Sequence, residues 1–378
     1  VSTDEQLVID RVEALLAEHD PKTTKPAEVL GAQYDAGLGW VPFPAGFGGL
    51  GVSPKLQNIV NAKLTAAGAP LPYGRNPIGH GMCAPTIVMH GSDEQKRRYL
   101  RPLFTSEEIW CQMFSEPGAG SDVAGLSTRA IRDGDEWILN GQKIWTTSAH
   151  FADWYWVGAR TDPDAPKHSG ITLFLVPMNH PGLTVQEIWT MGDERTNSVF
   201  FDDVRVPNDY VVGELGRGFQ YISEALDLER FTMFTFSPIK ARLDLLIDHV
   251  RTATRDGEAL SKDPVTRQRI AALATQAEVG RVLGLRFLAK SVAGGAAPTS
   301  EASEYKLFAT EFSKMLADAS MDICGPGSQL RVGTEEAPMK GRAESTYRYT
   351  VLDTIGGGTS EVQKNIIARR KLGLPKNF

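Results

Sequence analysis

A glycine-rich stretch near the end of the chain could bring the backbone close to a ligand. It reads TIGGGTSEVQKNIIARR and runs from Thr354 to Arg370. Glycine tolerates a close approach of backbone to ligand, and the helix predicted next would direct its first N–H groups towards a bound group. Position 357 is Gly, so the loop carries no acid or base there. If the loop is catalytic, its proton acceptor must come from another part of the chain.

Two further stretches offer hydroxyls and an aromatic plane. The loop FSEPGAGSD, residues 114–122, could present the hydroxyls of Ser115 and Ser121 to an anion or a flat polar ring, although a surface turn has the same composition. Trp145, in KIWTTSA, could stack on a flat heteroaromatic ligand or lie in the core, as most Trp residues do. The first loop is not a dinucleotide fingerprint, because no GxGxxG opens a helix after a strand.

A candidate proton acceptor occurs in the helical stretch EALDLERF. Glu229 follows Leu228 and precedes Arg230. By itself this pattern favours a solvent-facing helix carboxylate over a catalytic base.

Helical and strand-like patterns alternate along the chain. Apolar residues recur at helical spacing after the cap residues Ser2 or Thr3, Ser53 and Ser92. Later runs such as WYWVGAR and ITLFLVPM are β-branched or aromatic, and the dipeptide Asn140-Gly141 predicts a hairpin turn.

After Pro207 the helical period returns, with one pattern running from Gly218 towards Val250. We therefore predict an α+β multidomain chain with an N-terminal helical domain (1–110), a central β domain (111–213) and a C-terminal helical domain (214–378).

Composition excludes several classes of protein. The 378 residues carry 40 basic and 46 acidic side chains, a formal net charge of −6, whereas nucleic-acid-binding domains are usually basic. The longest apolar run is far shorter than the roughly 20 residues that span a bilayer. No signal peptide is visible, and three cysteines without metal-ligand spacing suit a reducing compartment. We expect a cytoplasmic protein with no metal site and no nucleic-acid or membrane partner.

Four motifs together resemble the acyl-CoA dehydrogenase family over almost the whole chain. FSEPGAGSD resembles the family's TEPxAGSD, NGQKIWTTSA resembles NGxKxWITN, VFFDDVRVP resembles the family's strand of the same sequence, and GGGTSEVQKNIIAR resembles xEGTSEIQRxxIAR. The resemblance implies an N-terminal helical domain, a central β-barrel-like domain and a C-terminal helical bundle.

The resemblance also answers the question of the missing base. Most members have Glu immediately before GTS, where this chain has Gly357. Members similar to isovaleryl-CoA and long-chain acyl-CoA dehydrogenases instead place it on the long helix before an Arg, and DLER puts Glu229 there. Glu229 would remove the α-proton of an acyl-CoA thioester while the β-hydrogen leaves as hydride to FAD. The trans-2-enoyl-CoA forms, and an electron-transfer flavoprotein takes the electrons.

Ligand contacts carry over by resemblance to matching positions. Trp145 would lie against the flavin ring, Thr147 would reach the ring nitrogen that accepts hydride, and the N–H of Gly357 would hold the thioester oxygen. The FAD-binding residues are Phe114, Ser115, Ser121, Trp145, Thr146, Thr147, Thr359, Ser360 and Glu361. The acyl-CoA-binding residues are Ser121, Asp227, Arg230, Gly357 and Gly358.

Two departures concern assembly. Family members form tetramers as pairs of dimers, in which RxxFG and QxxGG contact a neighbour's FAD. Here the corresponding stretches read RTATRDGEAL and DICGP, the latter from Asp322 to Pro326. A carboxylate near a diphosphate is unfavourable, so the sequence favours an α2β2 tetramer with a related chain over a homotetramer.

Other functions remain open at this level. A non-catalytic flavin- or CoA-binding subunit, or a flavin oxidase on the same fold, would share most motifs. Small residues in NPIGHGMCAPTIVMHG, residues 76–91, leave room for a branched or ring-bearing acyl group, such as a steroid side chain. That would place the protein in β-oxidation of lipids or steroids. Small residues also let helices pack closely, which explains them equally well.

Overall fold

The structure, a computed structural model, describes residues 2–233, 236–292 and 298–375, without the side chains of 228–236 and 291–297. Its contacts divide the chain into two units, which are described separately. Unit 1 comprises residues 1–188 and 195–228, and unit 2 comprises residues 189–194 and 229–378.

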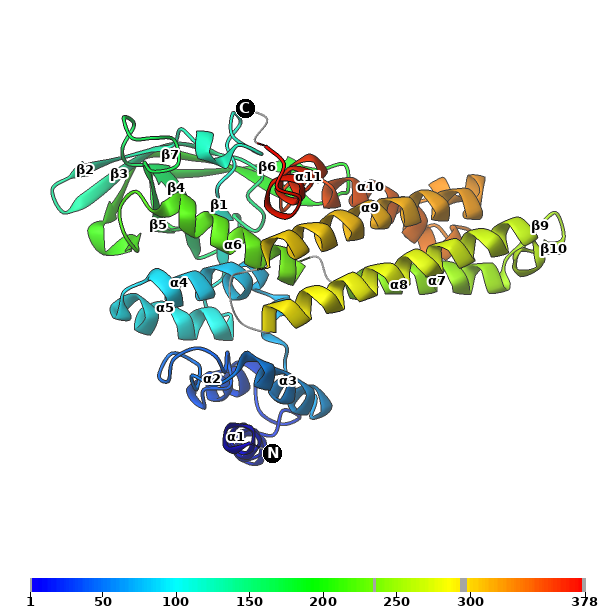
Figure 1. Ribbon diagram of the computed structural model, residues 1–378, viewed down its shortest axis with the longest axis horizontal. Coiled ribbons are helices and arrows are strands. Elements are labelled where there is room, and N and C mark those ends of the chain that lie inside the picture. The colour runs from blue at the N-terminus through cyan, green and yellow to red at the C-terminus, as the bar shows by residue number, and fades with distance from the viewer. Residues whose placement is uncertain (1, 234–235, 293–297, 376–378) are drawn as a thin grey trace. The chain divides into compact units, whose positions relative to one another are not determined.

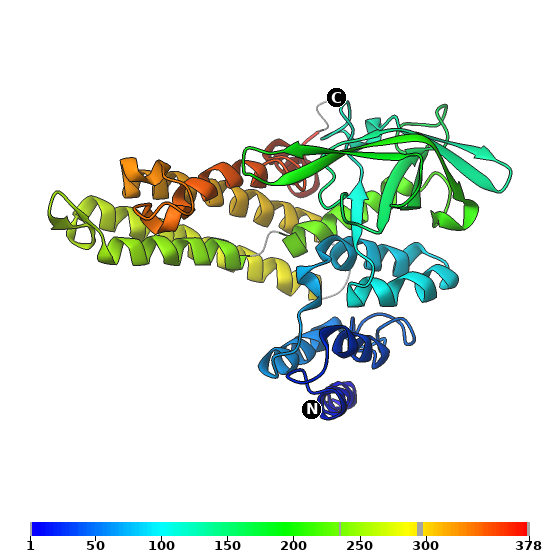
Figure 2. The ribbon, with the colours of Figure 1, turned by 180° about the vertical axis from the view of Figure 1, so that it is seen from behind.

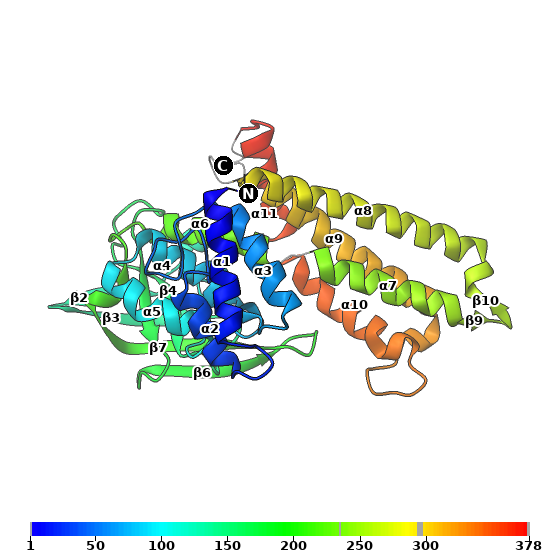
Figure 3. The same ribbon diagram turned by 90° about the horizontal axis from the view of Figure 1, so that it is seen from below.

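The helices of unit 1 begin largely where cap residues predicted. The side chain of Ser2 accepts a hydrogen bond from the N–H of Glu5 at 3.2 Å, and Ser92 with Gln95 forms a capping box. Ser53 makes no such bond, because a short 3₁₀ turn precedes the helix there. Figure 3 shows α1 and α3 side by side. The helices are α1 (Thr3–Glu18), α2 (Pro26–Asp35), α3 (Gln57–Ala66), α4 (Ala84–His90) and α5 (Asp93–Thr105).

A mixed sheet of eight strands also belongs to unit 1 (Figure 2). The strand order is β6-β7-β3-β2-β4-β5-β8. Strand β1 pairs in parallel with residues 154–157 of β4, and β2 pairs with β4 at Arg160, so both lie on the edge of β4 opposite β5. Six consecutive residues of both β4 and β5 are buried, so these strands are covered on both faces. The strands are β1 (Trp110–Met113), β2 (Arg129–Asp133), β3 (Glu136–Lys143), β4 (Trp154–Arg160), β5 (Ile171–Pro177), β6 (Leu183–Trp189), β7 (Arg195–Pro207) and β8 (Val211–Val212).

The predicted hairpin turn at Asn140-Gly141 is wrong. The chain turns earlier, between Asp133 and Glu136, and β3 continues through the dipeptide. The pairing of β3 with β7 shifts register between Leu139 and Gly141, so the dipeptide marks a β-bulge. A Cβ at Gly141 would lie 2.6 Å from the hydroxyl of Thr128, so close backbone approach explains this glycine.

The helical pattern after Pro207 divides into two helices. They are α6 (Gly218–Met233) and α7 (Phe236–Thr252). The prediction of one pattern continuing between them falls on residues 234–235, which lie outside the described residues.

Unit 2 contains long helices that run side by side (Figure 1). Their core joins Leu246 of α7, Leu273 of α8 and Phe312 of α9, among other buried side chains. Helix α9 also contacts α10 and α11. The helices that follow α7 are α8 (Pro264–Val292), α9 (Thr299–Cys324), α10 (Arg342–Asp353) and α11 (Ser360–Ile366), and a small hairpin pairs β9 (Thr254–Arg255) with β10 (Glu258–Ala259).

Within the ranges given above, length and hydropathy together leave no helix suited to crossing a membrane. The described His, Cys, Asp and Glu side chains likewise form no group of three or more that could hold a metal ion.

Candidate active site

Two loops of unit 1 that carry predicted FAD contacts are joined at their bases. The loop 114–122 begins after β1, and the loop with Trp145 begins where β3 ends at Lys143. The Nζ of Lys143 lies 2.8 Å from Oε1 of Glu116, and both side chains are buried. The N–H of Ile144 also donates to the carbonyl oxygen of Ser115 at 2.9 Å. The ion pair and the hydrogen bond hold the two loops together.

Glu116 is fully occupied by its partners. Besides Lys143, its carboxylate accepts hydrogen bonds from the N–H and hydroxyl of Ser127, at 2.6 and 2.7 Å, and from the N–H of Thr128 at 2.9 Å. Burial raises the pKa of Glu116, but Lys143 and these donors outweigh it and hold the pKa below its ordinary value. Glu116 therefore stays ionised and serves as a structural anchor.

Trp145 and Thr147 are presented to solvent on this base. Trp145 is 58% exposed and has φ of +60°, a conformation rarely taken by a bulky residue. It is therefore not the core residue that was the alternative interpretation. Between the two, Thr146 is buried and is held by Asn197, which accepts from its N–H at 3.0 Å and donates to its carbonyl oxygen at 2.9 Å.

The other predicted contacts in unit 1 differ in exposure. Phe114 is buried against Trp156, with ring centroids 5.0 Å apart, so its ring is not exposed to a ligand. Ser115 is partly buried and Ser121 is exposed. Asp227 of α6 is partly buried. Glu229 and Arg230 belong to α6, but their side chains lie outside the described residues.

In unit 2, the glycine loop ends at a helix as predicted. Gly357 and Gly358 have φ of +64° and +93°, values that glycine adopts without strain. The hydroxyl of Thr359 caps α11 by accepting from the N–H of Val362 at 3.2 Å. Ser360 is buried, and its hydroxyl donates to Glu311.

Both glycine carbonyls are held by buried side chains. The Nε2 of Gln363 donates to the oxygens of Gly357 and Gly358 at 3.1 and 3.0 Å. The Nζ of Lys306 donates to the oxygen of Gly358 at 2.8 Å and to that of Asp353 at 3.0 Å. Neither Lys306 nor Gln363 has exposed surface. Within the described part of the chain, the N–H groups of Gly357 and Gly358 have no hydrogen-bond partner.

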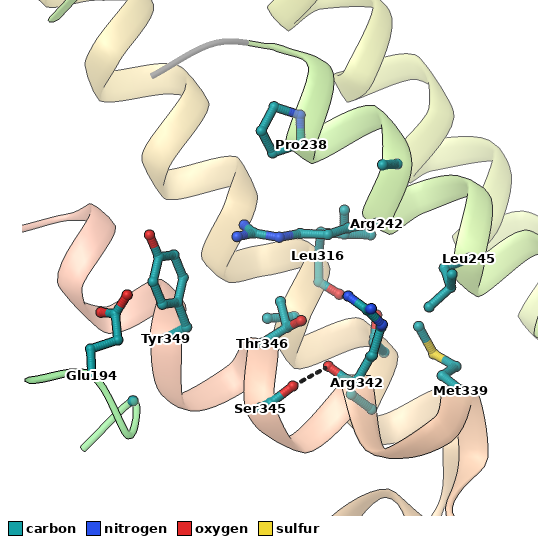
Figure 4. A pocket seen from close by; sticks show the side chains of 15 residues that line it. Glu194, Pro238, Arg242, Leu245, Leu316, Met339, Arg342, Ser345, Thr346 and Tyr349 are labelled. Atoms are coloured by element: carbon teal, nitrogen blue, oxygen red, sulfur yellow. Dashed lines mark hydrogen bonds between the residues drawn. The ribbon is translucent and has the colours of Figure 1, made fainter. Parts of the chain in front are cut away.

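A cavity of about 530 Å³ lies in unit 2 between α7, α9, α10 and the turn 189–194. Arg242 reaches from α7 towards Tyr349 of α10, with its guanidinium 5.5 Å from the ring centroid (Figure 4). Arg242 also lies 3.6 Å from Asp353. None of the lining residues is a predicted ligand contact: Gly192, Glu194, Pro238, Ala241, Arg242, Leu245, Leu316, Ala317, Ser320, Met339, Arg342, Ala343, Ser345, Thr346 and Tyr349.

The residues at the two altered assembly motifs bond within unit 2. Asp322 pairs with Arg269 at 2.7 Å, and both are exposed. Arg255, on β9, donates to the carbonyl oxygen of Ile323 at 2.7 Å. The charge of Asp322 is thus partly offset by Arg269, which weakens the repulsion expected from the sequence.

The segment 76–91 packs into the core of unit 1. A Cβ at Gly79 would lie 2.5 Å from the side chain of Asn76, so this glycine permits close packing. His80 is buried between Trp40 and Phe104, and burial lowers its pKa to about 3. At Gly79, close packing therefore explains the small residue better than room for an acyl group does.

The sequence did not single out the buried cations Lys143 and Lys306. For each lysine, the pattern of neighbouring residues along its strand or helix indicates an inward-facing side chain. Lys143 has the same strand alternation as the buried Trp137 and Leu139. Lys306 lies within a stripe of buried polar and small residues on α9. The stripe comprises Thr299, Ser303, Lys306, Thr310, Ser313, Ala317 and Ser320.

These residues fit a flavin by their chemistry. An exposed aromatic plane at Trp145 and an exposed hydroxyl at Thr147 can meet a flat ring with polar edges. The buried hydroxyl oxygen of Thr146 has no partner among the described residues, so the same loop holds a further unused polar atom.

Comparison with known proteins agrees with this chemistry. Family models for the N-terminal, middle and C-terminal domains of acyl-CoA dehydrogenases match residues 3–107, 111–204 and 216–372. The domain boundaries at 110 and 213 stay a prediction. The acyl-CoA dehydrogenase FadE26 of Mycobacterium tuberculosis is 35% identical over 90% of this chain and 84% of its own.

Two solved structures are also similar. The ChsE4–ChsE5 complex from Mycobacterium tuberculosis has a TM-score of 0.79 and 31% identity, with 100% of this chain and 99% of that chain covered. The Tcur3481–Tcur3483 steroid ACAD has a TM-score of 0.79 and 28% identity, with 98% and 97% covered.

The fold and these matches define an oxidoreductase of the FAD-dependent class that acts on acyl-CoA thioesters. The chain belongs to the acyl-CoA dehydrogenase family, with its helical N-terminal, β middle and helical C-terminal parts.

Proposed function

We propose that Glu229 is the base that removes the α-proton of an acyl-CoA, and that the N–H of Gly357 receives the thioester oxygen. The observation that carries this proposal is the loop at position 357. It has no carboxylate, and its N–H has no partner among the described residues, whereas its carbonyl oxygens are held. A loop of this kind can donate a hydrogen bond to developing negative charge without supplying the base.

The remaining site residues bind and orient. Trp145 and Thr147 hold the flavin ring of FAD, and Thr359, Ser360 and Glu361 contact the same cofactor. When bound, FAD takes up the β-hydrogen of the acyl chain together with its electron pair. Ser121, Asp227 and Arg230 contact the acyl-CoA.

We further propose a bulky or ring-bearing acyl group, of the steroid side-chain type, as the substrate. Support comes from the solved relative that is described as a steroid ACAD. Gly79 packs against Asn76, so its small size does not indicate room for a bulky acyl group. The substrate proposal therefore rests on the steroid ACAD. An electron-transfer flavoprotein is the proposed acceptor.

The proposed assembly is an α2β2 tetramer with a related chain. Arg255 donates to the carbonyl oxygen of Ile323 within unit 2, and position 322 holds a carboxylate where the family has an amide. Neither residue offers the family's contact to a neighbour's FAD. Two similar solved structures each contain two differently named chains. A related chain with intact RxxFG and QxxGG would supply the absent contacts.

Anaerobic titration of the FAD-loaded protein with straight, branched and steroid-side-chain acyl-CoAs tests the activity. We expect the flavin absorbance to bleach, and to return rapidly with electron-transfer flavoprotein but slowly with oxygen alone. Rapid return with oxygen alone would indicate an oxidase. A flavin that no acyl-CoA bleaches, with the chain alone or with its partner, would indicate a non-catalytic subunit.

A further inference from the structure

In the glycine loop of unit 2, the backbone carbonyl oxygens and the backbone N–H groups differ in their hydrogen bonding. Among the described residues, four hydrogen bonds from the side chains of Lys306 and Gln363 go to backbone carbonyl oxygens, three of them on Gly357 and Gly358. The N–H groups of the same glycines have no partner among the described residues. Two consecutive glycines with positive φ would otherwise be free to rotate. The side chains therefore restrict a loop whose sequence makes it pliable.

The two donors come from different elements. Lys306 lies on α9, and its second bond, to the carbonyl oxygen of Asp353, joins the last residue of α10 to the loop. Gln363 lies on α11, directly after the loop. Both side chains are fully buried, so water does not compete for their bonds. Lys306 of α9 and Gln363 of α11 thus hold the loop, and the bond to Asp353 also ties it to the end of α10.

We propose that Lys306 and Gln363 are positioning residues that fix the Gly357–Gly358 loop with the N–H of Gly357 directed at the thioester oxygen. This inference rests on the proposed function of Gly357 and adds how its donor is oriented. An oxyanion donor is effective only when it is already placed where the charge develops. Neither side chain needs to touch the substrate.

The test uses the FAD-loaded protein and a 3-thiaacyl-CoA carrying the acyl group that the titration selects. Sulfur at the β-position prevents oxidation. The base can therefore still remove the α-proton and return a deuteron from D₂O, and mass spectrometry follows this exchange. Lys306→Met removes the donor and keeps the length of the stem, and Gln363→Leu removes the other donor. Lys314→Met is the matched control, because Lys314 is exposed on the same helix α9.

We expect Lys306→Met to slow α-proton exchange by about 10²–10³-fold, the loss typical of one oxyanion donor. Binding of the analogue should change less than threefold, and backbone amides at 355–359 should exchange faster by at least about tenfold. Gln363→Leu should act in the same direction, and Lys314→Met should change nothing. A structural role alone would lower the melting temperature without this selective loss.

Two results would overturn parts of the account separately. If the wild-type protein exchanges the α-proton and both variants exchange it as fast, the positioning role is wrong while the proposed function stands. If the wild-type protein binds the analogue without exchanging its α-proton, the proposed function is wrong, and this role fails with it. If Lys306→Met does not fold, Gln363→Leu decides the question.

Discussion

Lys143 and Glu116 form an ion pair in the interior of unit 1, with 2.8 Å between Nζ and Oε1. Lys143 also donates to the carbonyl oxygen of Gly158 at 2.7 Å. Removing one member of a buried pair leaves the other charge without compensation. The pair lies at the base of both loops that carry the proposed flavin contacts, so its loss affects stability and cofactor binding together.

Lys143→Met should lower the free energy of unfolding by about 3–5 kcal/mol, because the carboxylate of Glu116 stays buried. Lys143→Met combined with Glu116→Gln should lose less than the sum of the single changes. Urea unfolding measures all three. Arg205→Met is the control, since its pairs with Asp133 and Glu136 are exposed and should contribute little to stability. Additive losses would contradict the coupling.

The pH dependence of stability should identify Glu116. Its folded pKa is lowered to about 2 from 4.5, so its contribution is fully present above pH 4.5 and is lost as the pH falls towards 2. Between pH 5 and 3, the wild-type protein should therefore lose more unfolding free energy than Glu116→Gln, by on the order of 2 kcal/mol. Equal losses in the two proteins would mean that Glu116 has an ordinary pKa.

Trp145→Ala should weaken FAD binding without affecting the fold. The side chain is 58% exposed, so the unfolding free energy should change by no more than about 0.5 kcal/mol. Loss of ring stacking should raise the dissociation constant of FAD by roughly 2–12-fold, from about 0.5–1.5 kcal/mol. Flavin fluorescence on titration measures it. Phe151→Ala, 52% exposed nearby, is the control. If both variants weaken FAD equally, Trp145 has no specific role.

Assembly can be tested by restoring the altered motif. Expressed alone, the chain should hold less than one FAD per chain, whereas Asp322→Gln with Pro326→Gly should raise the flavin content. The exposed pair of Asp322 with Arg269 contributes at most about 1 kcal/mol, so its loss should not unfold unit 2. Absorbance per chain and the mass of the assembly are the readouts. A wild-type homotetramer with one tightly bound FAD per chain and full activity would exclude the α2β2 proposal.

Local rules predicted most elements, because caps and alternation act within a few residues. Ser2 and Ser92 begin helices as expected. The prediction of a hairpin turn at Asn140-Gly141 was wrong because contacts with Thr128 and β7 decide the geometry of this dipeptide. The sequence of one strand does not specify which residues of a distant strand it will pair with.

The buried cations show the same limit at the site. Lys143 donates a hydrogen bond to Glu116, which is 27 positions away in the sequence, and Lys306 donates one to Gly358, which is 52 positions away. A local pattern marks each lysine as inward-facing but names no acceptor. The sequence predicted a loop at Gly357 and a ligand contact for Trp145. The exposure of Trp145 and the φ values of both residues follow from contacts that no motif contains.

The rate at which Glu229→Gln is reduced by its acyl-CoA tests the central claim most directly. Stopped-flow absorbance of anaerobic, FAD-loaded protein should show flavin bleaching at least about 10²–10⁴-fold slower than in the wild-type protein, because the amide cannot accept the α-proton. Binding of FAD and of the CoA thioester should be retained. Glu224→Gln, on the same helix α6, should bleach at the wild-type rate. Wild-type bleaching by Glu229→Gln would show that another group removes the α-proton and would contradict the account.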